Sequence, residues 1–149
     1  MKKFKLFINN DWVDAEGNKM FKSYNPCTGE VIAEMAYASA ADTRKAIDAA
    51  DEAFKSGCWS GLDADERAAY LLKVADILES RLEEFAKYES MDTGKPISET
   101  RTIDIPLSIR AFRFHADSAK SLTGKVITVP GHQQFNYTSY EPYGVVGSI

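Results

Sequence analysis

The chain has 149 residues, of which 44% are hydrophobic and 27% are charged, a composition that is ordinary for one globular domain. Eighteen Lys and Arg residues against 22 Asp and Glu residues give a net charge of -4, with the two signs interspersed. These values exclude a disordered chain, a collagen and a disulfide scaffold, and they argue against a nucleic-acid partner. Because no apolar run reaches the ~20 residues of a membrane helix and no signal peptide is visible, we expect a cytoplasmic protein without a membrane partner.

The first 37 residues predict short strands, because β-forming residues recur in brief runs separated by Asn, Asp, Gly and Pro. Residues 5–8 and 12–13 form one predicted hairpin around a turn at 9–11. Residues 20–24 and 30–37 form a second predicted pair, joined by the turn residues Asn25, Pro26, Thr28 and Gly29.

The residues from 40 to 119 predict helices. Ser39 and Asp42 resemble a capping box for a helix over 40–56 that Gly57 ends. Asp63 and Glu66 open a longer predicted helix that runs to the turn at 92–96. Its apolar stripe, which we expect in the core, is Leu71, Val74, Ala75, Leu78, Leu82 and Phe85.

A third helical pattern follows the turn, and the chain then returns to strand composition. The helical positions are Ile103, Leu107, Ala111, Phe114 and Ala119, with Pro106 expected to start or kink the helix. Residues 135–140 alternate like a strand but have too little apolar surface on either face for a core strand. Residues 145–149 are an apolar run typical of a strand buried on both faces, which favours the opening part of a larger α/β protein.

The residues that could carry chemistry do not form a catalytic set. Cys27 and Cys58 lack a neighbouring histidine or basic helix start, so we expect two unpaired thiols and no nucleophile. His115 and His132 lie far apart without a second ligand pair, which argues against zinc. The glycines at 144 and 147 lack the third glycine and the helix of a dinucleotide fingerprint.

Asp92 leaves alternatives open. Its position at a predicted helix end, beside Gly94 and Lys95, suits a loop cap, an ion pair with Lys95, or one ligand of a hard cation.

Taken in order, these segments resemble the N-terminal region of the aldehyde dehydrogenase superfamily over essentially the whole chain, with most similarity to betaine-aldehyde and semialdehyde members. The resemblance rests on six segments at 6–13, 24–32, 46–54, 66–78, 92–96 and 141–147, which read LFINNDWV, YNPCTGEVI, AIDAADEAF, ERAAYLLKVADIL, DTGKP and EPYGVVG. The resemblance rests on the order and spacing of the six segments, because no single one of these motifs would be sufficient to establish it.

The resemblance implies an α/β fold with three parts. Residues 1–131 would be the N-terminal part of a Rossmann-like NAD(P)-binding domain, 132–142 an oligomerisation arm strand, and 143–149 the truncated start of a buried Rossmann-type strand. The implied reaction oxidises an aldehyde to a carboxylic acid with NAD or NADP, through a thiohemiacetal and a thioester on a cysteine. The catalytic residues would lie beyond residue 149, so we expect the 149-residue chain alone to be inactive.

The resemblance also implies peripheral site residues. Ser23 and Asp92 match a place where many members bind a sodium or potassium ion. Ile103 and Leu107 resemble residues that border the substrate tunnel, and Ile149 resembles a residue at the edge of the nicotinamide pocket.

The arm gives a second possible function. Phe135, Tyr137 and Tyr140 resemble residues of a strand that pairs with another subunit in a homodimer or homotetramer. The alternative to an enzyme segment is therefore a non-catalytic oligomerisation or interaction module that pairs through this strand.

Overall fold

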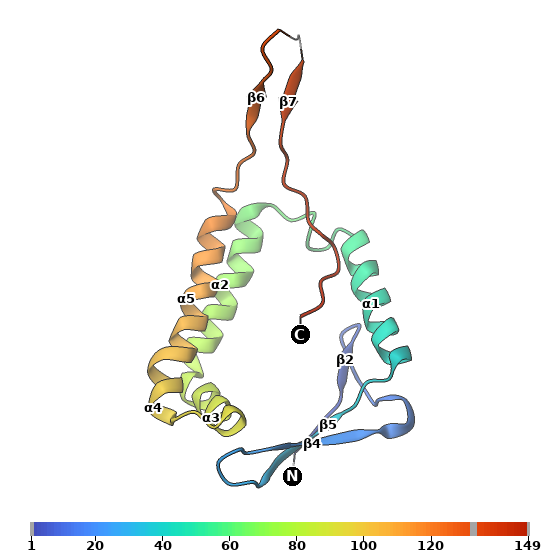
Figure 1. Cartoon of the computed structure of the whole chain (residues 1–149), viewed down its shortest axis with the longest axis vertical. Coiled ribbons are helices and arrows are strands. Elements are labelled where there is room, and N and C mark those ends of the chain that lie inside the picture. The colour runs from blue at the N-terminus through green and yellow to red at the C-terminus, as the bar shows by residue number, and fades with distance from the viewer. Residues whose placement is uncertain (1, 132–133, 149) are drawn as a thin grey trace.

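A computed structural model describes residues 2–131 and 134–148, and it is a mixed α/β structure. Helices α2 and α5 stand side by side on one flank, α1 stands on the other, strands join them at the base, and a hairpin projects from the opposite end (Figure 1). None of the helices in the described ranges combines the length and apolar character that a membrane crossing requires.

The N-terminal strands follow the predicted turns. Strands β2 (Leu6–Ile8) and β3 (Asp11–Val13) form the predicted antiparallel hairpin. Asn9 and Asn10 both have positive φ (52° and 63°), the conformation of a type I′ turn, which asparagine tolerates better than most residues. Strands β4 (Met20–Tyr24) and β5 (Val31–Ala36) form the second predicted pair.

The N-terminal strand is an addition that the sequence did not predict. Strand β1 (Lys2–Phe4) pairs in parallel with β5, so the sheet has the order β1-β5-β4. A short 3-10 helix, η1 (Glu16–Asn18), lies between β3 and β4. Its Glu16 N–H donates to the Asp42 carboxylate at 2.9 Å and thereby ties this loop to the start of α1.

Both predicted capping boxes are present. Helix α1 (Ala40–Lys55) begins where the Asp42 N–H donates to the Ser39 hydroxyl at 3.1 Å and the Ser39 N–H donates to the Asp42 carboxylate at 3.0 Å. These backbone hydrogen bonds lower the pKa of Asp42 below its ordinary value. Helix α2 (Ala64–Ser80) begins with the same reciprocal pair between Asp63 and Glu66.

The single long helix predicted after Asp63 was wrong, because it breaks at Arg81. Arg81 has φ -116° and ψ 23°, and the chain continues as α3 (Leu82–Thr93) in a new direction. On the two sides of the break, Ala75 of α2 and Ala86 of α3 lie in the same core cluster. The apolar stripe continues on both sides of Arg81, so its periodicity hides the break.

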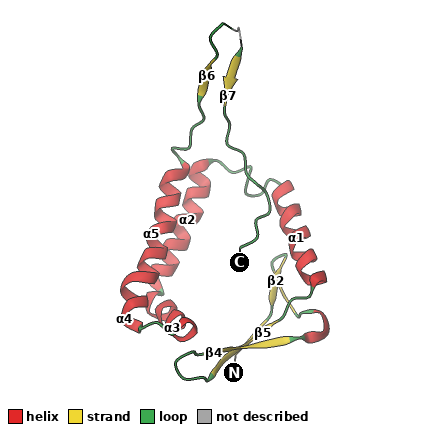
Figure 2. Ribbon diagram, viewed as in Figure 1, coloured by secondary structure: helices red, strands yellow, loops and turns green. Residues whose placement is uncertain are grey.

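The third helix is confirmed but is built in three parts. A turn of α-helix, α4 (Ile97–Glu99), leads into a π-helical segment, η2 (Thr100–Asp104), and then into α5 (Ile105–Ala119), with Pro106 in its first turn (Figure 2). The core contains the small side chains of Ala75 and Ala86 together with Ile105 and Ile109. The predicted core stripe is only partly right, since Leu78, Leu82 and Phe85 are half-buried against this core whereas Val74 is 39% exposed.

The last described elements form the projecting hairpin. Strand β6 (Val126–Thr128) pairs antiparallel with β7 (Phe135–Tyr137), and all six residues are exposed. The buried strand expected at 143–149 is not formed by the described residues 143–148, and Val146 is 74% exposed. A buried strand needs hydrogen-bonding neighbours and covering layers, and the described part of the chain places neither beside this segment.

Candidate functional site

Ser23 and Asp92, expected at one site, do meet in the structure. Ser23 lies in β4 and Asp92 in the last turn of α3, and the Ser23 hydroxyl donates to the Asp92 carboxylate at 2.8 Å. Gly94 ends α3 with φ 78°, and its Cα faces Pro26, so a Cβ there would lie 2.8 Å from the proline ring. The β4–β5 turn and the end of α3 are therefore packed tightly together.

The same geometry excludes one of the three roles considered for Asp92. Lys95 pairs with Asp104 at 2.8 Å, and this hydrogen bond raises the pKa of Lys95, so the ion pair between Asp92 and Lys95 was wrong. A hard cation takes about six or more oxygens. Within the described ranges no three His, Cys, Asp or Glu side chains gather around one point, so Ser23 and Asp92 alone do not complete an ion site.

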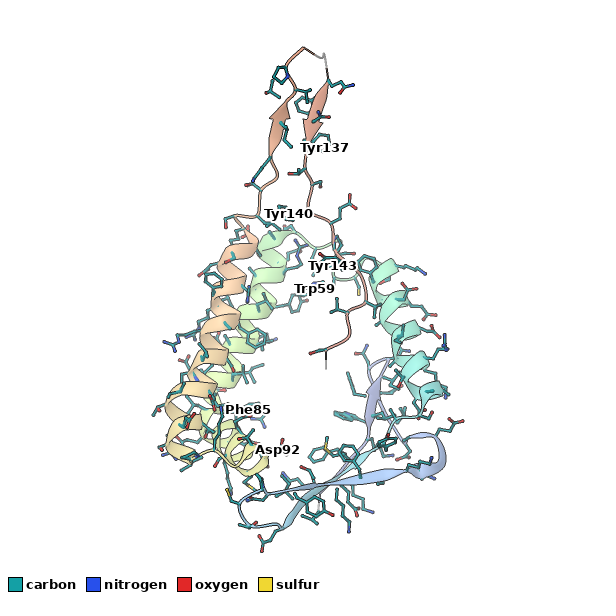
Figure 3. The ribbon with its side chains drawn as sticks, viewed as in Figure 1. Trp59, Phe85, Asp92, Tyr137, Tyr140 and Tyr143 are labelled. Atoms are coloured by element: carbon teal, nitrogen blue, oxygen red, sulfur yellow. The ribbon has the colours of Figure 1, made fainter. Side chains whose placement is uncertain are left out.

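A hollow of about 370 Å³ opens beside Asp92, between the β1-β5-β4 sheet and α3. Its walls are mainly apolar, formed by Phe4, Ile32, Ala33, Met35, Phe85, Met91 and Ile105. Figure 3 shows Phe85 and Asp92 near each other on α3, at the end of the molecule opposite the projecting hairpin. No local sequence pattern predicts this hollow, because its walls combine strand residues before position 36 with helix residues after position 84.

Lys2 closes one side of the hollow. Its Nζ donates to the Tyr88 hydroxyl at 2.6 Å and lies 4.9 Å from the centre of the tyrosine ring. The hydrogen bond to Tyr88 raises the pKa of Lys2. Since 86 positions separate the two residues, no local pattern could have predicted the contact.

Ile103 and Leu107, expected along a substrate tunnel, lie apart from the hollow. Ile103 is 52% exposed and Leu107 is 55% exposed, and both lie on the side of the helix opposite the buried Ile105 and Ile109. The structure therefore keeps them out of the core of the described residues and leaves them available to a partner or ligand.

The three expected arm residues are among the more exposed side chains. Phe135, Tyr137 and Tyr140 are 75%, 67% and 67% exposed, and the first two rings lie 5.9 Å apart, centre to centre. Tyr137 lies on the projecting hairpin and Tyr140 at its base (Figure 3). Exposed aromatic side chains on a strand are typical of a protein interface.

The remaining candidates supply no reaction centre. Cys27 and Cys58 are exposed free thiols, and within residues 2–131 and 134–148 no hydrogen bond joins either one to a histidine. His115 stacks edge-on against Phe114, with ring centres 5.4 Å apart. Ile149 and His132 lie outside the described residues. The glycines at 144 and 147 belong to a loop with no helix after it among the described residues, so the part described here forms no cradle for a dinucleotide.

Comparison with known proteins supplies the identity. The sequence model of the family described as "Aldehyde dehydrogenase family" matches residues 12–149. The chain is 41% identical over 145 residues to the putative aldehyde dehydrogenase DhaS of Bacillus subtilis (strain 168), covering 97% of this chain and 29% of that protein. It is 40% identical over 146 residues to human retinal dehydrogenase 2, covering 97% of this chain and 28% of that protein.

The fold agrees with the sequence match. The structure of the NAD+ complex of aldehyde dehydrogenase from Bacillus cereus superposes with a TM-score of 0.87 at 36% identity, covering 95% of this chain and 28% of that one. The chain thus spans less than a third of the length of these relatives. Over nearly all of its own length, however, sequence and fold agree on one family. The chain belongs to the aldehyde dehydrogenase family.

Proposed function

We propose that this chain contributes the N-terminal portion of an NAD(P)-dependent aldehyde dehydrogenase, which oxidises an aldehyde to a carboxylic acid. The family match over residues 12–149 carries the proposal. NAD+ complexes of the relatives from Bacillus cereus and Pseudomonas syringae support the cofactor class. The catalytic cysteine and glutamate then lie outside the 149 residues, in agreement with the free, unassisted thiols of Cys27 and Cys58.

The exposed apolar surface supports a role as one part of a larger fold. Trp12 on β3 and Tyr70 and Ile77 on α2 are 63%, 57% and 46% exposed, which is a large amount of exposed apolar surface for two separate elements. In the proposal, residues 1–131 are the first part of the NAD(P)-binding domain, and residues 143–149 form a Rossmann-type strand only when neighbouring strands flank it. The kinship with betaine-aldehyde and semialdehyde members stays a prediction, as does the cytoplasmic location.

The test uses the complete open reading frame that contains these 149 codons. The purified product should form NADH or NADPH, measured by absorbance, when an aldehyde is added. A double variant, Cys27→Ala with Cys58→Ala, should keep that activity, because neither thiol is the nucleophile. A product that folds but oxidises no aldehyde with either cofactor contradicts the proposal, and a double variant that is folded but inactive contradicts the placement of the nucleophile.

The 149-residue chain alone serves as the second sample. We expect it to form no NADH with any aldehyde, since its described residues contain neither a nucleophile with a base nor a dinucleotide cradle. Aldehyde-dependent NADH formation by the pure chain would refute this.

We propose the hairpin β6–β7 as the arm that joins subunits in a homodimer or homotetramer. Its support is the exposure of Phe135 and Tyr137 on a strand whose outer edge has no partner among the described residues. Light scattering after gel filtration should give a smaller particle for Tyr137→Lys than for the unmodified product. The control Tyr70→Lys places the same charge on α2, and an equal effect of both variants would argue against the arm.

The alternative function, a non-catalytic interaction module, rests on the same hairpin. It requires the 149-residue chain to form a discrete oligomer by itself. A monodisperse oligomer with no aldehyde oxidation by the complete gene product would favour the module over the enzyme.

The proposed sodium or potassium ion depends on oxygens beyond those of Ser23 and Asp92. If such an ion binds, the melting temperature of the complete gene product should be higher in potassium or sodium chloride than in choline chloride. Asp92→Asn should abolish this difference, whereas Asp48→Asn on α1 should keep it. Equal melting temperatures of the unmodified product in all three salts would leave Ser23 and Asp92 as a structural tie between β4 and α3.

A further inference from the structure

The π-helical segment η2 forms a turn that holds one residue more than an α-helical turn. The Ile105 N–H donates to the Thr100 carbonyl, a bond that spans five residues instead of four. Helical backbone nevertheless runs through η2, since Thr100, Asp104 and Ile105 all have the φ and ψ of a right-handed helix. The chain from Ile97 to Ala119 is therefore one continuous helix with a single wide turn.

The buried positions of this helix show where the extra residue lies. Thr100, Ile105, Ile109 and Ala116 are 0%, 8%, 4% and 1% exposed, so the buried side is spaced by five, four and seven residues. Spacings of four and seven keep to one face of an α-helix, whereas five residues at 3.6 per turn rotate by about 140°. The wide turn brings Thr100 to the same buried side as Ile105.

The side chain of Thr100 joins η2 to α3. Its hydroxyl donates to the Ala86 carbonyl of α3 at 2.9 Å and lies 3.2 Å from the Ile97 carbonyl in its own helix. Because a fully buried hydroxyl needs an acceptor, moving Thr100 away from Ala86 costs free energy. Both acceptors belong to this chain, so this bond needs no partner and no further part of a longer protein.

Two ion pairs hold the residues on either side of the extra residue. Arg101 pairs with Glu83 of α3 at 2.8 Å, and Asp104 pairs with Lys95 in the turn after α3 at 2.8 Å. Thr102 lies between Arg101 and Asp104, and its hydroxyl donates to a carbonyl of its own helix. The wide turn is thus fastened to α3 at both of its ends.

Pro106 gives a physical cause for the wide turn. It lies inside the continuous helix and has no N–H, and a proline ring there crowds the carbonyl four residues earlier, that of Thr102. A wider turn before the proline relieves this crowding. Single π turns inside α-helices are rare and are frequently found at functional sites.

We propose that η2 is a hinge that carries one inserted residue and that the Thr100 hydroxyl is its latch. With the hydroxyl bound to Ala86, α4 and α5 form one rigid helix; without it, η2 opens locally while α5 stays folded. This inference concerns a conformational device of the fold and does not rest on the proposed enzymatic function.

Hydrogen exchange of the complete gene product, resolved to single amides by mass spectrometry, tests the latch. Thr100→Val keeps the shape of the side chain and removes the hydroxyl. The Ile105 amide should then exchange about tenfold faster, the effect of one hydrogen bond of ordinary strength, whereas the Ile109 amide should not change. Thr100→Ser, which keeps a hydroxyl, should restore the slow exchange of Ile105.

Thr102→Val is the matched control, because it removes a hydroxyl that bonds only one turn back in the same helix, to the Ser98 carbonyl at 2.7 Å. It should leave the Ile105 amide unchanged. An unchanged Ile105 amide in Thr100→Val overturns the latch. Equal acceleration at Ile105 and Ile109 also overturns it, because that result means a uniform loss of stability and no local opening.

Deletion of Thr102 tests the inserted residue. It leaves Thr100 and Ile105 four residues apart, so an ordinary α-helical turn keeps both on the buried side. The control is deletion of Lys73, an exposed residue of α2, which turns the buried Ala75 by about 100° relative to Ala68.

The melting temperature of the complete gene product should fall less than half as far on deletion of Thr102 as on deletion of Lys73. A Thr102 deletion that folds while the Lys73 deletion does not also supports the insertion. Equal losses, a larger loss on deletion of Thr102, or failure of both variants to fold overturns it.

Discussion

Truncation of Ile109 to alanine should lower the free energy of unfolding of the 149-residue chain by about 3 kcal/mol. Ile109 is 4% exposed and packs in the cluster with Ala75, Ala86 and Ile105. The change removes three buried carbon atoms, worth ~2.4 kcal/mol at ~0.8 kcal/mol each, and the cavity left behind adds to this. For a chain of this length, the melting temperature should fall by about 6–12 °C.

Leu107→Ala is the matched control, because it also truncates an aliphatic side chain on α5. Leu107 is 55% exposed, so its loss should change the free energy of unfolding by less than about 0.5 kcal/mol. Urea unfolding followed by far-ultraviolet circular dichroism measures both values. Equal losses for the two variants, or a larger loss for Leu107→Ala, would mean that α5 turns a different face to α2.

Two further predictions concern local structure, and urea unfolding tests both. Gly94→Ala should destabilise the chain by more than Gly17→Ala. Both glycines have positive φ, 78° and 70°, but only at Gly94 would an added Cβ lie 2.8 Å from the Pro26 ring. Equal losses of stability in the two variants would refute the close packing of Gly94 against Pro26. Because hydrogen bonds lower the pKa of folded Asp42 below its ordinary 3.8, its ionised form stabilises the fold fully above about pH 5 and loses this effect as the pH falls through the folded pKa. The stability difference between the unmodified chain and Asp42→Asn should therefore shrink below about pH 4, whereas a difference that grows there, or one that Asp48→Asn reproduces, would contradict the assignment.

The arrangement around Arg81 shows how far the sequence alone reaches. Its apolar period predicted helix on both sides of Arg81, and both sides are helical. Ala86 and Ile105 share one core cluster, and their approach depends on how α3 and α5 pack. A period records which side of a helix is apolar, but it contains no information about where the axis changes direction.

The candidate site divides in the same way. The family resemblance carried by short segments placed Ser23 and Asp92 at one site, and the structure brings them within hydrogen-bonding distance. Ser23 donates a hydrogen bond to Asp92, whereas Lys95 forms an ion pair with Asp104. Both contacts follow from the packing of α3 against its neighbours and are not visible in the local sequence. The strand expected at 143–149 is not formed by the described residues 143–148 for a related reason, since an apolar run becomes a strand only beside other strands.

The sequence by itself determined the features whose energetics are local. The hairpin turn at Asn9 and Asn10 and the capping boxes that begin at Ser39 and Asp63 were predicted because the groups that bond lie within four residues of one another. Only the tertiary structure decided that β1 joins β5 in parallel and that α5 turns Leu107 outward. These features depend on free energies of contact between segments that are distant along the chain, and the chain pattern does not specify which of its apolar faces will find a partner.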